Sequence, residues 1–274
     1  MNDHSEATSA DTHEMASRID TTRPHPARRY NYWLGGKDNF AADRASGDAI
    51  AAKFPGIRIG AQENRKFLRR AVTHLASEAG IEQFLDIGTG LPTADNTHEV
   101  AQRTAPQSKV VYVDNDPLVM VHARALLTSA EVGVTDYVEA DLREPDKIML
   151  EAARTLDFSQ PVALMLVAVL HFIGDDDDPY GIVARLVDGL APGSYLVISH
   201  ATDEHLPEAV KAAFANMPDR PSFRDHEQVT RFFSGLQLVP PGVVSSVEWR
   251  VENEPGPRAS VEDVATHCGV ARKP

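Results

Sequence analysis

The spacing of apolar residues changes near residue 80 of this chain. Over 61–79, apolar side chains recur every three or four positions, which is the spacing of one helix face, and Gly80 follows where helices commonly end. A weaker helical pattern covers 43–53. Beyond residue 80, short apolar runs alternate with amphipathic segments, which indicates that strands and helices alternate from there on.

Five buried strands are predicted in the middle of the chain. These apolar runs lie at 83–87, 110–113, 136–140, 161–170 and 195–199. Helices are predicted between them, at about 94–104, 116–127 and 178–190. Asp116 and Asp178 are each followed by proline, and an aspartate cap followed by proline is a typical helix start.

The alternation of strand and helix predicts an α/β fold with a doubly wound, mostly parallel sheet. After residue 200 the pattern changes. Helical stretches at about 205–216 and 225–234 precede strand candidates at 237–239, 243–251 and 265–271. We expect the last segments to add an antiparallel pair to one edge of the sheet.

The N-terminal part divides into a polar leader and an aromatic segment. Residues 1–24 are rich in Ser, Thr, Asp and Glu and show no apolar periodicity, which is typical of a disordered tail. The stretch ARRYNYWLGGKDNF that follows groups aromatic residues around Gly35 and Gly36. We interpret 25–80 as a helical lid hinged at these glycines and 81–274 as the ligand-binding core. The alternative is that the aromatic residues only staple the N-terminal helices together.

Composition excludes several classes of protein. The 274 residues include 27 Lys and Arg against 40 Asp and Glu, a net charge of −13, which disfavours a nucleic-acid partner. Cys268 is the only cysteine, so an intramolecular disulfide and a Cys-rich zinc site are both excluded. No secretory signal is present, and the longest nearly apolar run, 161–173, is too short to cross a bilayer. We expect a cytoplasmic protein without a membrane partner.

The stretch FLDIGTGLPT at 84–93 gives the clearest chemical signal. Gly88 and Gly90 form a tight turn after the first strand, where a ligand can approach the backbone. Asp86 places a carboxylate below this turn, which opposes a pyrophosphate but suits the cationic groups of S-adenosylmethionine. Thr93 stands where a dinucleotide-binding turn has Gly or Ala, so an NAD-dependent oxidoreductase is disfavoured. A plain tight turn without a ligand is the alternative.

Two further acids follow the next two strands. Asp114, with Asn115 as its polar companion, stands where a carboxylate can accept both ribose hydroxyls. Asp141 could accept from an adenine amino group, and Leu142 would supply an apolar wall. Each acid alone could be a cap or a turn residue. Because the ends of successive parallel strands line one crevice, the three acids together predict a nucleoside site.

In these stretches the chain resembles the class I S-adenosylmethionine-dependent methyltransferases, and more narrowly the DUF574 or methyltransferase-19 family. The matching stretches are YNYWLGGKDNFAADR at 30–44, FLDIGTGLPT at 84–93, VVYVDNDP at 110–117, residues 161–185, and GVARKP at 269–274. The resemblance extends from about residue 23 to the C-terminus. It implies a Rossmann-like, seven-stranded sheet and S-adenosylmethionine as cofactor, and it names no acceptor.

The resemblance also implies a place for each part of the cofactor. It places Asp86, Gly88 and Gly90 at the methionine end, Asp114 at the ribose, and Asp141 with Leu142 at the adenine. A fourth position falls at Ala168 to His171, after the fourth strand. Many relatives carry an acid or an Asn-Pro-Pro type sequence there, whereas this chain has VLH at 169–171, so the resemblance does not extend to amino-methylation of nucleobases.

Three side chains are candidates for roles beyond nucleoside binding. His171 stands at a strand end on the crevice, where a histidine can deprotonate a hydroxyl or amine near neutral pH. Its alternatives are a backbone hydrogen bond, or no base at all, because alignment alone can supply much of the rate. Tyr32 is expected to contact the cofactor from the lid. Arg65 could pair with the methionine carboxylate, or could be an ordinary exposed helical arginine.

The acidic run at 175–178 has the oxygen ligands that Mg²⁺ or Ca²⁺ prefers, but consecutive acids cannot converge on one ion without a folded loop. We expect a solvated loop with Asp178 as a helix cap, and no metal site. The hypothesis from the sequence is an S-adenosylmethionine-dependent methyltransferase that acts on a small-molecule acceptor. The alternative is a protein that binds S-adenosylmethionine without transferring its methyl group.

Overall fold

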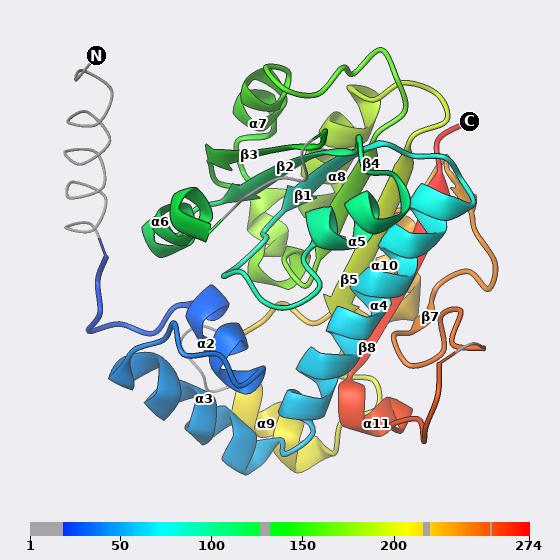
Figure 1. Ribbon diagram of the computed structural model, residues 1–274. Coiled ribbons are helices and arrows are strands. Elements are labelled where there is room, and N and C mark those ends of the chain that lie inside the picture. The colour runs from blue at the N-terminus through cyan, green and yellow to red at the C-terminus, as the bar shows by residue number, and fades with distance from the viewer. Residues whose placement is uncertain (1–18, 127–131, 216–219, 253) are drawn as a thin grey trace, which may run out of the picture.

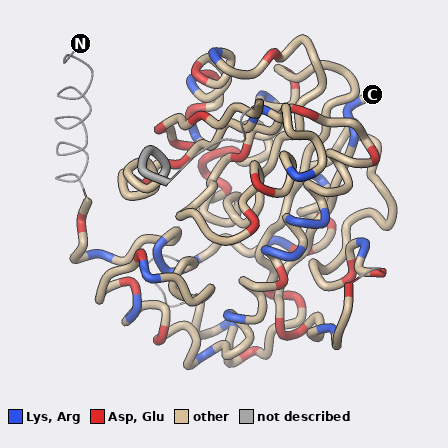
Figure 2. Tube along the Cα trace, viewed as in Figure 1, with Lys and Arg blue, Asp and Glu red and all other residues tan. Residues whose placement is uncertain are grey.

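The computed structural model describes residues 19–126, 132–215, 220–252 and 254–274, so most of the predicted leader lies outside the described residues. Helices cover both faces of a central sheet (Figure 1). Acidic and basic residues are interspersed over the surface of the chain, and basic residues recur along α4 (Ile57–Ser77) (Figure 2). Within these described residues, we find no helix with the length and apolar character needed to span a bilayer.

The sheet contains eight strands among the described residues, in the order β3-β2-β1-β4-β5-β8-β6, with β7 also paired to β8. The strands are β1 (Gln83–Ile87), β2 (Lys109–Asp114), β3 (Val134–Glu139), β4 (Ala163–Val167), β5 (Tyr195–Ala201), β6 (Gln237–Leu238), β7 (Val244–Ser245) and β8 (Thr266–Arg272). β1 to β5 are parallel, and β8 runs antiparallel to β5. The predicted mostly parallel sheet with an antiparallel C-terminal edge is confirmed.

The expected count of seven strands is wrong, and the reason lies in β8. One side of this strand pairs with β5 along its whole length. Its other side is shared by two short segments, because β6 pairs at Ala271 and Arg272 while β7 pairs at His267 and Cys268. Two strands of two residues each therefore occupy one position in the sheet.

The predicted helices form, with shifted ends, and others join them. The remaining helices are α2 (Pro26–Trp33), α3 (Ala41–Lys53), α5 (Thr97–Thr104), α6 (Pro117–Leu126), α7 (Pro145–Ala152), α8 (Pro179–Asp188), α9 (Glu208–Ala215), α10 (His226–Arg231) and α11 (Val261–Val264). Neither α2 nor α7 was expected from the sequence. Each begins at a proline, whose fixed φ and missing N–H suit the first turn of a helix.

The core consists of two apolar layers, one on each face of the sheet. Leu85 and Ile87 of β1 pack with α7 and α8, whereas Phe84 packs with α4 and α5 on the other face. Successive strand residues alternate between faces, so a strand that is covered on both sides reads as one continuous apolar run. Asp86 shares the face of Phe84 and therefore points toward α5.

A buried ion pair fixes α2 against the end of β2. Arg28 and Asp116 are 4% and 1% exposed, and Nε and Nη2 of the arginine donate to the carboxylate at 3.0 and 3.2 Å. His25 Nδ1 lies 3.2 Å from the same carboxylate, which also accepts the Leu118 N–H at the start of α6. One acid thus holds the N-terminal helices against the sheet.

We expect Arg28→Met to lower the free energy of unfolding by about 3 kcal/mol, because Asp116 would stay buried with its main cation removed. The matched control is Arg58→Met. Arg58 pairs with Asp48 on the surface, with side chains 42% and 59% exposed, and should contribute less than about 1 kcal/mol. Urea denaturation of both variants measures the difference, and equal losses would contradict the anchoring role of Arg28.

Candidate functional site

A cavity of about 280 Å³ lies at the carboxyl edge of the parallel strands. Its walls come from α2, α4 and the ends of β1 to β5, and they continue to the segment around α9 and the start of β8. The structure brings together all the predicted site residues except Tyr32. Those that line the cavity are Arg65, Asp86, Gly88, Gly90, Asp114, Asn115, Asp141, Leu142, Ala168 and His171.

The turn after β1 requires both of its glycines. Gly88 and Gly90 have φ of +75° and +68°, which side chains other than glycine rarely adopt. A Cβ at Gly88 would lie 2.4 Å from the side chain of Val169, so the turn also packs tightly against the end of β4. The Gly90 N–H donates to Asp114 Oδ2 at 2.8 Å, which links the turn to the end of β2.

Asp114 has capacity left for a ligand. Its Oδ1 accepts the Asp116 N–H at 2.9 Å, and its Oδ2 accepts the Gly90 N–H. Burial raises the pKa of this carboxyl, against the lowering effect of the two backbone bonds. An ionised carboxylate has about four lone-pair sites, so about two remain for hydroxyl donors in the cavity.

Asp141 and Asn115 form a second polar pair, at the end of β3. Asn115 Nδ2 donates to Asp141 Oδ2 at 3.0 Å, and Arg143 donates its backbone N–H and Nη1 to Oδ1 at 2.9 and 3.1 Å. Burial acts to raise the pKa of Asp141, but these bonds together lower it, so the group is ionised at neutral pH. The buried side chain of Leu142 lies beside this pair and gives the cavity an apolar wall.

Asp86 is the most deeply placed of the three acids, with 4% of its surface exposed. Thr97 Oγ1 donates to its Oδ2 at 2.6 Å from the first turn of α5. Burial raises the pKa of Asp86 to about 6, in spite of the Thr97 bond and the charge of Arg65, and Asp114 adds to the increase. This carboxyl therefore changes its charge just below neutral pH.

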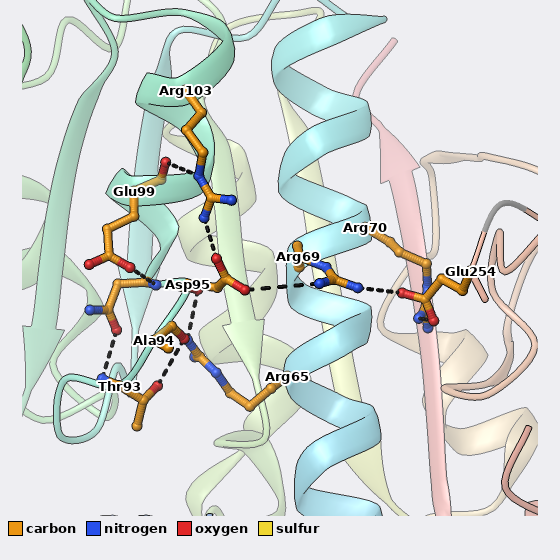
Figure 3. Close-up of polar contacts among 10 residues, drawn as sticks. Arg65, Arg69, Arg70, Thr93, Ala94, Asp95, Glu99, Arg103 and Glu254 are labelled. Atoms are coloured by element: carbon orange, nitrogen blue, oxygen red, sulfur yellow. Dashed lines mark hydrogen bonds and ion pairs between the residues drawn. The ribbon is translucent and has the colours of Figure 1, made fainter. Parts of the chain in front are cut away.

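Arg65 is a partly buried arginine of α4 that lines the cavity and also binds the backbone of a neighbouring loop. Its Nη2 donates to the backbone carbonyls of Ala94 and Asp95, at 3.2 and 2.8 Å (Figure 3). Asp95 has φ of +59°, an unfavourable backbone conformation for a residue with a side chain. The guanidinium thus holds the loop that follows the glycine turn and lines the cavity at the same time.

Further ion pairs along α4 stabilise the same loop. Arg69 and Arg103 both contact the Asp95 carboxylate, with Arg69 Nη1 4.0 Å from Oδ2 (Figure 3). Arg69 also donates to Glu254 at 2.9 Å, and Arg70 donates to the other oxygen of that glutamate at 2.7 Å. The helix therefore connects the glycine turn to the segment that precedes α11.

His171 reaches the cavity because the chain turns sharply after β4. Ala168 has φ of +57°, and its N–H donates to the Ser199 carbonyl and hydroxyl at 3.1 and 2.9 Å. Burial lowers the pKa of His171 to about 3, and the charges of Arg224 and Arg29 add to this effect. A neutral ring is therefore favoured at neutral pH, because the imidazolium would be buried beside two guanidinium groups, and the role of His171 as a general base stays a prediction.

The alternative role for His171, a ring hydrogen bond to the backbone, is not present at Nδ1. This atom is buried and has no hydrogen-bond partner within the described part of the chain. His171 as a whole lines the cavity, and a neutral imidazole can accept a hydrogen bond from a ligand through one of its ring nitrogens.

The expectation for Tyr32 is also wrong, for a geometric reason. Its hydroxyl donates to Asp48 at 2.8 Å, and Arg58 lies over its ring at 4.9 Å, away from the cavity. Tyr30 and Trp33 line the cavity instead. Residues three apart share a helix face, so 30 and 33 point inward together while 32 cannot.

Asn64 also lines the cavity, although its place there was not predicted from the sequence. Its Nδ2 donates to the Tyr30 hydroxyl at 2.9 Å, and that hydroxyl donates to the Ala61 carbonyl at 3.0 Å, which fixes the amide orientation. Its Oδ1 is buried and lacks a partner among the residues described. The signal was available, because a polar residue four positions before Leu68 interrupts the apolar helix face.

The acidic run forms η2 (Asp175–Asp177), a short 3₁₀ helix that is exposed and ion-paired. Asp175 accepts from Arg224 at 2.7 Å, and Asp177 accepts from Arg143 at 2.9 Å. Asp178 caps α8 by accepting the Gly181 N–H at 3.1 Å, as predicted. These acids hold the loop next to the cavity rather than entering it.

The donor set of the cavity fits S-adenosylmethionine. Buried carboxylates lie beside the glycine turn, where the cationic methionine end is expected and where the anionic pyrophosphate of a dinucleotide would be repelled. Asp114 retains sites for ribose hydroxyls, and the oxygen of Asn64 lacks a donor. Open space lies beyond Gly90, since a Cβ there would meet only Ala27 at 3.9 Å.

Comparison with known proteins gives consistent matches. The sequence model of the S-adenosyl methyltransferase family matches residues 12–274. A DUF574 family protein from Streptomyces avermitilis is 45% identical with a TM-score of 0.87, covering 94% of this chain and 100% of that one. A candidate methyltransferase from Thermobifida fusca is 43% identical with a TM-score of 0.85, covering 93% and 96%. No curated protein matches the chain.

The raised pKa of Asp86 predicts how ligand affinity depends on pH. A cationic ligand favours the ionised carboxylate, so affinity for S-adenosylmethionine should rise with pH and level off above about 7. Below pH 6 it should fall, approaching tenfold per unit, and binding should release a proton. Calorimetric titration in two buffers measures the pH-dependent affinity and the release of the proton. Asp86→Asn should bind more weakly and show a flatter profile, whereas an unchanged slope would assign the titration to another group.

Proposed function

Because the chain belongs to the S-adenosyl methyltransferase family, we propose that it transfers the methyl group of S-adenosylmethionine to a small-molecule acceptor. The observation that supports this best is the meeting of Asp86, Asp114 and Asp141 around the turn of Gly88 and Gly90 in one cavity. When bound, the cofactor supplies a methyl carbon made electrophilic by a positively charged sulfur.

The residues at the strand ends hold the nucleoside. Asp114 accepts the ribose hydroxyls on the lone pairs that its backbone bonds leave available. Asp141, oriented by Asn115, accepts from the adenine amino group, and Leu142 covers the ring. These contacts fix the nucleoside over β2 and β3 because each side chain is itself held by hydrogen bonds.

The methionine end lies between the glycine turn and α4. Asp86 supplies negative charge below the cationic groups, and Asn64 Oδ1 accepts from the ammonium group. Arg65 balances the methionine carboxylate while it holds the loop at Ala94. The helices of 25–80 cover this end and serve as the lid.

His171 acts as a positioning residue. Its neutral ring accepts a hydrogen bond from the acceptor and orients the attacking atom, and alignment of this kind can supply a large part of the rate. Removal of a proton by this histidine is disfavoured, because an imidazolium would form beside Arg29 and Arg224.

Thermal unfolding tests the proposed function. S-adenosylmethionine and S-adenosylhomocysteine should raise the melting temperature, while NAD should leave it unchanged. Asp114→Ala should weaken cofactor binding by about 1–3 kcal/mol, since the ribose hydroxyls lose a charged acceptor. The control Asp188→Ala removes an exposed acid outside the cavity and should bind as the parent does. Formation of S-adenosylhomocysteine in cell extract separates a methyltransferase from a protein that only binds the cofactor.

For His171 we expect a variant that binds but turns over slowly. His171→Ala should keep the affinity for S-adenosylhomocysteine and lose roughly three- to tenfold in kcat, the effect of one neutral hydrogen bond. The pH profile of kcat should show no ionisation near pH 6.5 in the parent or in the variant. A loss of a hundredfold or more, or such a titration removed by the substitution, would restore the role of general base.

A further inference from the structure

The cavity continues past the cofactor-binding acids into a second lobe over β4, β5 and β8. We call it the acceptor lobe and define it by six apolar lining residues: Trp33, Ile50, Phe54, Leu206, Phe214 and Phe223. These side chains come from α2, α3, α9 and the segments beside α9, and they pack into one cluster. A lobe walled by aromatic and aliphatic groups favours an apolar ring over a sugar or an extended peptide.

Charge is divided along the cavity by strand. The acids among the described lining residues follow β1, β2 and β3, which lie side by side in the sheet. The lining of the described acceptor lobe includes Arg29, His171 and His200, and no acid. β3 and β5 lie four strand positions apart, roughly 19 Å, so Asp141 after β3 lies far from His200 in β5, although Arg65 and Arg143 also line the cavity beside the acids.

The two histidines of the lobe are neutral, and the charge behind them is positive. His200 Nδ1 donates to the Ala201 carbonyl at 2.8 Å, so its Nε2 accepts from Arg224 Nη1 at 2.9 Å. Arg224 is 2% exposed and lies behind His200 rather than among the described lining residues, and its guanidinium is also ion-paired with Asp175 at 2.7 Å. Arg29 and Arg224 both oppose protonation of His171. A protonated amine entering this lobe would lose its hydration and meet the same positive potential.

On the premise of the proposed function, we propose that the methyl acceptor is a small apolar molecule with an anionic oxygen, either a carboxylate or an acidic phenol. The positive groups stabilise the oxygen anion, and the apolar side chains enclose the ring. The oxygen lone pair forms the bond to the methyl carbon as the carbon–sulfur bond breaks and its electron pair stays on sulfur. No proton leaves the acceptor, which agrees with a lobe whose two histidines have lowered pKa values.

Calorimetry on the protein saturated with S-adenosylhomocysteine tests this proposal. The probes are ring compounds matched in shape: naphthoate, naphthamide and naphthylmethylamine for the carboxylate arm, and nitrophenol with nitrobenzene, above neutral pH, for the phenol arm. We expect at least one anionic probe to bind about tenfold or more tightly than its neutral partner, and the amine to bind weakest. The arm that responds identifies the carboxylate or the phenol.

Arg29→Gln should reduce the preference for the anionic probe by about tenfold while the affinity for S-adenosylhomocysteine stays unchanged. Arg58→Gln is the matched control, since it removes a cation of the same region that lies outside the cavity. The proposal is overturned if the amide or amine binds as tightly as the acid, or if no anionic probe binds. These comparisons use the unmodified chain, so they remain decisive even where Arg29→Gln does not fold. Failure to bind S-adenosylhomocysteine would instead contradict the proposed function.

Discussion

Everything in the site depends on one property of parallel sheets, that the carboxyl ends of all strands meet at one edge. Asp86 lies one residue before the end of β1, Asp114 ends β2 and Asp141 follows β3, and none of these acids is near another in sequence. Hydrogen bonding between neighbouring strands fixes the spacing of the strands and thereby brings Asp86, Asp114 and Asp141 to one cavity. The Gly90 N–H completes the arrangement by donating directly to Asp114.

A sheet edge alone is an open surface, and the N-terminal helices convert it into a cavity. α2 is held over the edge by the buried pair of Arg28 and Asp116, and α4 holds the loop after β1 through Arg65. One wall of the cavity and the loop after the glycine turn are consequently positioned by the same segment of chain.

Burial acts in opposite directions on the two kinds of titratable group in the cavity. It raises the pKa of Asp86 to about 6 and lowers that of His171 to about 3, because in both cases the charged form loses water. A cationic ligand restores the charge of the acid, whereas the guanidinium groups keep the histidine neutral. At neutral pH the cavity therefore holds a mostly ionised Asp86 and a neutral His171.

Local patterns in the sequence predict the α/β class, the first five strands, the glycine turn and the acids at the ends of three strands. These features are local, since apolar periodicity and strand ends are written in adjacent residues, and the parallel-sheet rule then brings the ends together. Tertiary structure decided which side of α2 faces the cavity, so that Tyr30 and Trp33 line it while Tyr32 does not. The fold also determines the protonation state of His171, because Arg224, more than fifty positions away in the sequence, comes close enough to oppose protonation of its ring only in the folded chain. Orientation and pKa depend on neighbours that are distant in sequence, and for that physical reason no local pattern could specify them.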